Sequence, residues 1–334
     1  MGSNTGTDPA GPALWRAEHA GGAFRDDIAA CRALVAERRG PHYVAHSTYG
    51  LRDFAVGMVD SWPGGEGMAD DLESAGSQLS LAVTQLDEVC RPLDSGPLIR
   101  LVLHGAGGAF YEVVKVPGQS FFGVTFDGGE AAVDHADRQL ASLARESVHR
   151  LGGHSLNWGG FRRREDSGDL WIPYRAQADA TASAPVVTVA DAVPGAVTDP
   201  CLAALSLDDL HAVGLYRQGR LAWAADLFDA PALAPFFQRV TPEFRRRGYA
   251  QVAHQVTLQS RRFGRLLDLT GSRKLVRLVL DVARGAMYAL PLGGEEYLVG
   301  VTLVQSRVDQ ADRKLRDLLA RIRPSWPVPA DRAP

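Results

Sequence analysis

Three sequence blocks occur twice along this chain, in the same order both times. The first two pairs are 177 residues apart and the third pair is 175 apart, so a two-residue deletion in one turn keeps the series in register. A chain with such internal similarity is built from repeated copies of one structural unit. The repeat therefore predicts two diverged copies of one small module. The matched blocks are Leu98-Ile-Arg-Leu-Val-Leu103 with Leu275-Val-Arg-Leu-Val-Leu280, Phe122-Gly-Val-Thr-Phe126 with Val299-Gly-Val-Thr-Leu303, and Val133-Asp-His-Ala-Asp-Arg-Gln-Leu140 with Val308-Asp-Gln-Ala-Asp-Arg-Lys-Leu315.

The apolar spacing predicts the same series of elements in each copy. In the first copy it predicts a helix over 24–39, a hairpin over 42–60, a long amphipathic helix that ends near Cys90, three strands within 98–127 and a closing helix from Val133. In the second copy it predicts a short first helix at 201–210, a hairpin over 211–227, a long helix over 242–269, three strands within 274–304 and a closing helix over 308–322.

This order of elements, α-β-β-α-β-β-β-α, predicts an α+β fold in which one five-stranded, mostly antiparallel sheet is covered by helices. Residues 151–200 show no clear periodicity, and a connector of that length marks a domain boundary. Its aromatic residues indicate that part of it docks on a domain surface. The expected organisation is a disordered tail (1–23), a first domain (24–150), an irregular, partly docked linker (151–200), a second domain (201–323) and a tail (324–334). The linker aromatics are Trp158, Phe161, Trp171 and Tyr174.

The composition indicates a soluble globular protein. With 46% hydrophobic and 22% charged residues, the chain is neither disordered nor fibrous in type. No apolar run approaches the roughly 20 residues of a membrane-spanning helix, and the first 24 residues lack the pattern of a secretory signal. The three cysteines, Cys31, Cys90 and Cys201, lie far apart, which fits a reducing cytoplasm and argues against a structural zinc site. We therefore expect a cytoplasmic protein without a membrane segment.

The charges are unevenly divided along the chain. Residues 1–200 contain 16 basic and 26 acidic residues, a net charge of −10, whereas residues 201–334 contain 20 and 13, a net charge of +7. This asymmetry favours attraction between the two copies, or toward partners of opposite charge. The basic half has neither interleaved aromatic residues nor a recognisable binding motif, so we do not expect nucleic acid as a partner.

The sequence carries no complete catalytic signature. It has no G-x-x-x-x-G-K-[ST], G-x-S-x-G or H-E-x-x-H motif. The stretch His104-Gly-Ala-Gly-Gly108 is similar to the Gly-rich oxyanion loop of esterases, but a hairpin turn with glycines at positive φ accounts for it better. The histidines, among them His42 and His46, are not paired at i, i+4. We therefore predict a protein that is not an enzyme and has no cofactor or metal.

The repeated blocks and the order of elements resemble the roadblock / dynein light chain family. The resemblance rests on Phe122-Gly-Val-Thr-Phe126 and on the helix start Val133-Asp-His-Ala-Asp-Arg138, an apolar strand followed by a polar turn and a helix. It covers about 125 residues of the first copy and about 115 of the second.

The resemblance implies a roadblock/profilin-like module that acts as a non-enzymatic platform. Roadblock modules dimerise, and many bacterial ones regulate or anchor a small Ras-like GTPase. It thus implies a scaffold or regulator with a protein partner, a small GTPase, and with self-pairing of the copies as an internal pseudo-dimer or as a homodimer. The family's partner-contacting residues do not map by motif onto this chain.

A row of arginines on the predicted long helix of the second copy is the candidate partner-binding site. The guanidinium group suits carboxylates and phosphates, and a solvated helix face is the alternative interpretation. The candidate residues are Arg245, Arg246, Arg261, Arg262 and Arg265.

Two other functions stay open at this point. Sheets of this build can enclose an apolar pocket, so a small-molecule-sensing or binding module is the first alternative; a closed, filled space between sheet and long helix would argue against it. The second alternative is an enzyme with a site in the linker around His154, Asn157 and Trp158.

Overall fold

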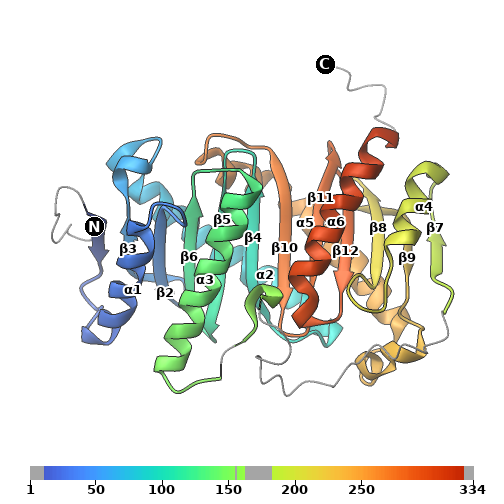
Figure 1. Cartoon of the computed structure of the whole chain (residues 1–334), viewed down its shortest axis with the longest axis horizontal. Helices are drawn as coiled ribbons and strands as arrows, with labels where there is room; N and C mark the ends of the chain where they lie inside the picture. Colours follow the sequence, from blue (N-terminus) through green and yellow to red (C-terminus); the bar gives the residue numbers. More distant parts are fainter. Residues whose placement is uncertain (1–10, 155, 162–182, 327–334) are drawn as a thin grey trace. The chain divides into compact units, whose positions relative to one another are not determined.

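A computed structural model describes residues 11–154, 156–161 and 183–326 of the chain. It has the predicted α+β character, with helices packed on an antiparallel sheet (Figure 1). The main elements are β1 (Ala13–Arg16), α1 (Arg25–Ala36), β2 (Tyr43–Thr48), β3 (Leu51–Gly57), α2 (Ala69–Cys90), β4 (Leu98–Gly105), β5 (Gly108–Val116), β6 (Gln119–Thr125), α3 (Glu130–Arg150), β7 (Val186–Val189), α4 (Gly195–Ala204), β8 (Ala212–Arg217), β9 (Arg220–Asp226), α5 (Pro242–Asp268), β10 (Leu275–Val282), β11 (Gly285–Gly293), β12 (Glu296–Thr302) and α6 (Val308–Ile322).

The number of strands corrects the prediction of two five-stranded sheets. The sheet has twelve strands, in the order β1-β3-β2-β6-β5-β4-β10-β11-β12-β8-β9-β7. Each half of the sequence supplies the five predicted strands and one more, β1 or β7, at the end of the order. These two strands have four residues each, which is too short to show an alternating pattern in the sequence. They form because each pairs antiparallel with the second strand of a hairpin, β3 or β9.

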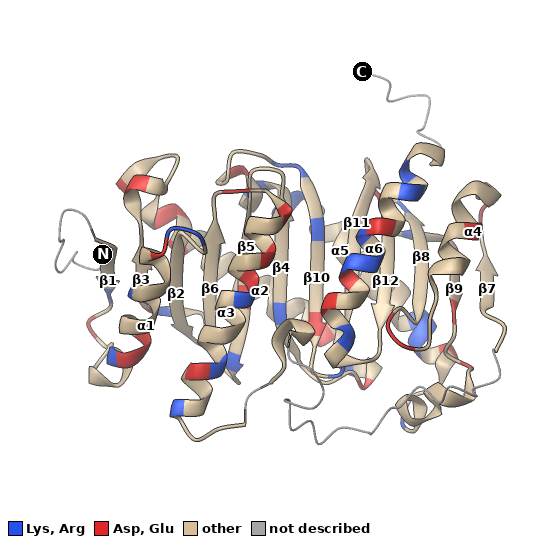
Figure 2. Cartoon of the chain, viewed as in Figure 1, with Lys and Arg blue, Asp and Glu red and all other residues tan. Residues whose placement is uncertain are grey.

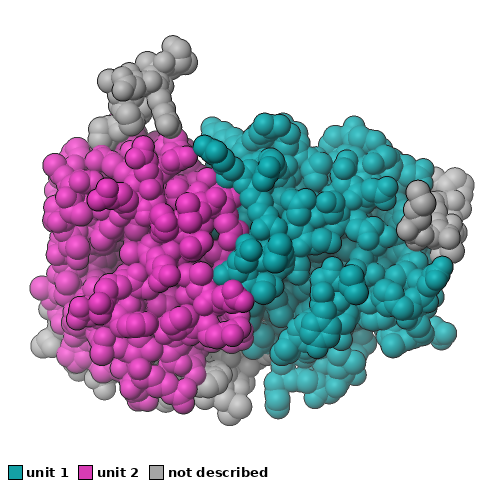
Figure 3. Space-filling model, turned by 180° about the vertical axis from the view of Figure 1, so that it is seen from behind, with its two compact units in different colours: residues 1–85, 98–159, 261–278 teal, residues 86–97, 160–260, 279–334 magenta. Residues whose placement is uncertain are grey.

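The chain divides into two compact units, each made of three segments (Figure 3). Unit 1 contains Met1–Gln85, Leu98–Gly159 and Arg261–Leu278, and unit 2 contains Leu86–Pro97, Gly160–Ser260 and Val279–Pro334. The chain therefore passes from one unit to the other inside both long helices, α2 and α5. A division into two consecutive stretches of sequence does not describe the units.

Each unit includes one segment from the half of the sequence that supplies most of the other unit: Arg261–Leu278 in unit 1 and Leu86–Pro97 in unit 2. We call these the exchanged segments, and hydrogen bonds of the same kind hold both. In unit 1, the Ala106 N–H donates to the Lys274 carbonyl (2.9 Å), and in unit 2 the Ala283 N–H donates to the Pro97 carbonyl (3.0 Å). Ala283 lies 177 positions after Ala106, and Lys274 lies 177 positions after Pro97, so the two bonds exchange equivalent positions of the repeat. The side chain of Leu267 in unit 1 lies directly against Gly105, where a Cβ atom would be 2.6 Å from it. Each unit thus completes its core with a segment from the other half of the sequence.

The two faces of the unit 1 sheet carry different helices. Phe122 on β6 packs against Gly76 of α2, while its neighbour Gly123 faces Leu140 of α3. Since successive strand residues point to opposite faces, α2 and α3 cover opposite sides of the sheet. In unit 2, Gly300 on β12 faces Leu315 of α6 in the same way. Residues of both charges occur along α3 and α6 (Figure 2).

In each unit one histidine, half-buried His42 or buried His211, bonds to the backbone just after the neighbouring strand. Nδ1 of His42 accepts a hydrogen bond from the Phe126 N–H (3.0 Å), and Nδ1 of His211 accepts one from the Leu303 N–H (3.1 Å). Burial lowers the pKa of both imidazoles. Both rings are therefore neutral hydrogen-bond acceptors at pH 7.

No described helix is both long and apolar enough to cross a bilayer.

Candidate functional site

The five predicted arginines fall into two groups. Arg245 and Arg246 belong to unit 2, and Arg261, Arg262 and Arg265 belong to unit 1. Because α5 crosses between the units, the row of arginines does not lie in one compact unit. Whether any of the five binds a partner stays a prediction.

Arg245 and Arg246 make contacts inside unit 2. Arg245 is buried, with its guanidinium carbon 5.0 Å from the centre of the Phe237 ring. Arg246 donates from Nε and Nη2 to the two carboxylate oxygens of Asp226, at 2.7 and 2.8 Å, and also donates to Asp229. The Asp226 hydrogen bonds are the main cause of the raised pKa of Arg246. These two arginines therefore help to build unit 2.

The arginines in unit 1 lie at the surface. Arg261 and Arg265 are exposed, and Nη1 of Arg262 donates to Oε1 of Gln85 on α2 (3.3 Å). This contact places the end of α5 beside α2 within unit 1. Leu81, one turn before Gln85, is 51% exposed. The sequence pattern identified these arginines but not the apolar residue on the neighbouring helix.

Unit 2 contains a pocket whose lining residues the sequence did not identify. Its volume is about 460 Å³, which includes its opening to solvent. It lies between one face of the sheet and α5, and we call it the unit 2 pocket. Most of its lining is apolar, with Tyr216, Tyr249 and the Asp226–Arg246 pair as its main polar groups. The lining residues are Thr188, Ala212, Val213, Gly214, Tyr216, Leu221, Ala224, Ala225, Asp226, Phe228, Arg246, Tyr249, Val299 and Val301.

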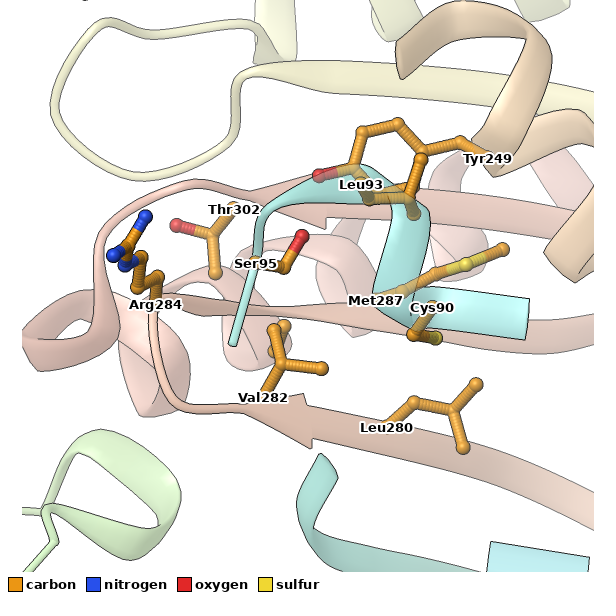
Figure 4. Close-up of a pocket in the computed structure, with 10 residues that line it drawn as sticks. Cys90, Leu93, Ser95, Tyr249, Leu280, Val282, Arg284, Met287 and Thr302 are labelled. Atoms are coloured by element: carbon orange, nitrogen blue, oxygen red, sulfur yellow. The ribbon is translucent and has the colours of Figure 1, made fainter. Parts of the chain in front are cut away.

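A second, smaller pocket in unit 2 shares Tyr249 with the first. Its volume is about 310 Å³, including open space, and Cys90, Leu93 and Ser95 of the exchanged segment line it together with residues of β10 and β11 (Figure 4). Burial raises the pKa of the Cys90 thiol to about 12, so the sulfur stays protonated and is a poor nucleophile. The Arg284 guanidinium in the wall is bound to Asp94, at 3.0 Å from its carboxylate. This pocket offers no reactive group.

The histidines do not form a catalytic arrangement among the described residues. His46 bonds Asp53 through Nδ1 (2.8 Å), but its ring stacks on Phe54 and lies against Phe24 and Phe121. Burial lowers the pKa of His46. The His104 loop forms the predicted turn between β4 and β5, with Gly105 paired to Gly108.

The three residues of the alternative enzyme site in the linker differ in their exposure to solvent. His154 is exposed, Asn157 is buried, and the buried Trp158 donates from Nε1 to the Val114 carbonyl (2.9 Å). Trp158 therefore packs within unit 1, and Trp171 and Tyr174 lie outside the described residues. Within the described ranges, no three His, Cys, Asp or Glu side chains are grouped so that they could hold a metal ion.

Glu112 is a buried carboxyl group on the sheet face under α2. Burial raises its pKa to about 8, although Ser120 donates to its Oε1 at 2.5 Å. The folded state therefore holds a proton that the unfolded state releases near pH 4.5, so folding loses stability as pH rises from 4.5 to 8. We expect Glu112→Gln to stabilise the protein at pH 8 by a few kcal/mol and to have little effect at pH 4.5. Urea unfolding at pH 8 and at pH 4.5 measures the change in unfolding free energy. Equal changes at the two pH values would contradict the raised pKa of Glu112.

Comparison with known proteins gives little. No protein-family model matches the chain, and no curated protein matches it. A solved structure described as MglB with tetrameric arrangement is similar at 13% identity, covering 39% of this chain and 93% of that one, with a TM-score of 0.31. A likeness at that score supports no conclusion about fold or function.

Proposed function

We propose that this chain is a cytoplasmic, non-enzymatic scaffold or regulator built from two roadblock-like modules. It acts through protein–protein contacts, and its partner is a small Ras-like GTPase, as the family resemblance implies. The repeated blocks and the shared order of elements support the choice of family. The observation that supports a binding role is the surface of unit 1 formed by α2 and the end of α5.

The exposed face of α2 is free of charge over three turns. The exposed residues between 74 and 85 are all uncharged, and they recur every three or four positions, so they share one helix face. Charged residues are depleted in the cores of protein interfaces, whereas arginine is enriched there. With Leu81 exposed on this face, and with Arg261 and Arg265 exposed in the same unit, the composition is that of an interface. The residues of the α2 face are Ser74, Ser77, Gln78, Leu81, Thr84 and Gln85.

The chemistry of this surface defines the partner that it suits. Leu81 supplies an apolar contact, and the two exposed arginines favour carboxylates, to which guanidinium can form two parallel hydrogen bonds. A partner with an apolar patch bordered by acidic residues would match both features. We call the set Leu81, Arg261 and Arg265 the unit 1 surface.

The proposal is tested by measuring retention of candidate small GTPases, loaded with GDP or with a GTP analogue, on the immobilised full chain. We expect retention in at least one nucleotide state. Leu81→Asp and the double change Arg261→Glu with Arg265→Glu should each weaken it about tenfold or more, which corresponds to roughly 1.4 kcal/mol.

Arg247→Glu is the matched control. Arg247 is exposed on the same helix but belongs to unit 2, so this variant should bind like the wild type. Absence of retention in both nucleotide states rejects the GTPase as partner. Retention that the unit 1 variants do not weaken rejects the surface.

A further inference from the structure

The two units differ in what fills the space between the sheet and the long helix. In unit 1 the space holds a cluster of buried aromatic rings. The Trp15 and Trp62 rings stack with centroids 5.4 Å apart, and the Tyr43 ring meets Trp62 edge-on at 5.7 Å and Phe122 at 6.0 Å. These side chains are at most 6% exposed. Unit 1 therefore has no room for a ligand at this place.

Strand register identifies the residues that take these places in unit 2. Trp15 lies opposite Ala55 at the edge of the unit 1 sheet, and Thr188 lies opposite Ala224 at the edge of the unit 2 sheet. Strand pairing also relates Tyr43 to Ala212. Tyr43 on β2 lies opposite Gly57 on β3, and Ala212 on β8 lies opposite Asp226 on β9. Phe122 corresponds to Val299 in the repeated block.

Three large rings in unit 1 are thus replaced by threonine, alanine and valine in unit 2. All three replacements line the unit 2 pocket. A pocket lined by apolar side chains, with few polar groups, is the usual form of a small-molecule site. The missing side-chain volume defines the shape of the space: it is the place that an indole and a phenol ring occupy in unit 1.

One polar group in the pocket lacks a partner. Only 5% of the Tyr216 surface is exposed. Its hydroxyl forms no hydrogen bond with any described residue. Its ring lies across Gly214, where a Cβ atom would be 2.8 Å from the ring and 3.6 Å from the hydroxyl oxygen. The hydroxyl oxygen is open to the pocket space and is not enclosed by protein, so a ligand in the pocket can reach it and hydrogen-bond to it.

The charges in the pocket are already neutralised. Arg246 is bound by both oxygens of Asp226 and by Asp229. A charged ligand would therefore lose its hydration without gaining an unpaired ion partner in return. The pocket suits a neutral molecule.

We propose that the unit 2 pocket binds a neutral, planar aromatic molecule of about the size of indole, which hydrogen-bonds to the Tyr216 hydroxyl. This site is separate from the unit 1 surface, so neither proposal depends on the other. The ligand would occupy in unit 2 the space that Trp15 and Tyr43 fill in unit 1.

Indole is the probe for this site, titrated into the full chain and followed by calorimetry and ligand-detected NMR. We expect saturable binding of one indole per chain. Thr188→Trp, which restores the ring found at the unit 1 position, should weaken binding at least tenfold. Val187→Trp is the matched control. Val187 and Thr188 are both exposed neighbours on β7, but Val187 points to the opposite face, so the introduced indole ring would point away from the pocket.

A second pair of measurements covers the case that Thr188→Trp does not fold. Val299→Phe reproduces Phe122 inside the pocket and should also weaken indole binding. Tyr216→Phe should weaken binding of indole but not of indene, which has a similar shape and no N–H group. The proposal is overturned if wild type shows no saturable binding, if the filled variants bind as well as wild type, or if Tyr216→Phe affects both probes equally.

Discussion

Residues 1–160 and 183–334, produced as two separate polypeptides, should each fail to fold as a monomer. Unit 1 takes Arg261–Leu278 from the second half of the sequence, and unit 2 takes Leu86–Pro97 from the first. The fragment 1–160 would therefore lack Phe263, Leu266 and Leu267, all at most 2% exposed in the full chain. Loss of one such side chain costs about 2–5 kcal/mol, and a domain has only about 5–15 kcal/mol of stability.

The two fragments mixed together provide the control for this experiment. Co-expression should restore a folded 1:1 complex, because both exchanged segments are then present. Light scattering gives the mass of each species, and circular dichroism during heating shows whether it unfolds cooperatively. A folded, cooperative monomer of either fragment would contradict the division into exchanged units. A folded homodimer of one fragment would agree with it, since a second copy could supply the equivalent segment.

Acidification should destabilise the full chain strongly between pH 6.5 and 4. Burial lowers the pKa of His104 and His211 to about 4. In the unfolded chain these imidazoles bind a proton below about pH 6.5. In the folded chain they do so only near pH 4. The folded state therefore loses stability as pH falls through this window, by on the order of 3 kcal/mol for each histidine.

His211→Asn isolates one of these contributions. The amide oxygen of asparagine can still accept the Leu303 N–H, but the side chain does not titrate, so the stability of this variant should depend less on pH between 6.5 and 4. His135→Asn, at an exposed position of α3, is the control and should leave the dependence unchanged. Urea unfolding across the pH range measures both. The opposite contribution of Glu112 is the same in all three proteins and cancels in the comparison. Equal pH dependence in His211→Asn and wild type would refute the role of this ring.

The sequence predicted the parts of the fold that depend on local pattern. Both long helices and the five strands of each half follow from apolar spacing, and the turn after His104 follows from its glycines. The first helix of the second half is α4, at Gly195–Ala204 instead of 201–210. Its sequence contains Pro200, which hides the helical pattern.

Features that depend on distant contacts could not be predicted. Arg245 and Arg261 are both arginines on one helix, and nothing local distinguishes them. Arg245 is buried because Phe237 and the Asp94 carbonyl lie beside it, and Asp94 is 151 residues away. The unit 2 pocket depends on Thr188 standing where Trp15 stands in unit 1. That correspondence becomes visible only from the pairing of β1 with β3 and of β7 with β9.

The passage of α2 from one compact unit into the other also limits how this protein can evolve. Up to Gln85 the helix packs in unit 1, and from Leu86 it packs in unit 2. One residue inserted at that point would rotate everything after it by about 100°, since an α-helix has 3.6 residues per turn. Leu86, Cys90 and Leu93 would then leave the core that they fill. Among relatives of this protein, insertions and deletions should accumulate in the loops, while the length of the two long helices stays fixed.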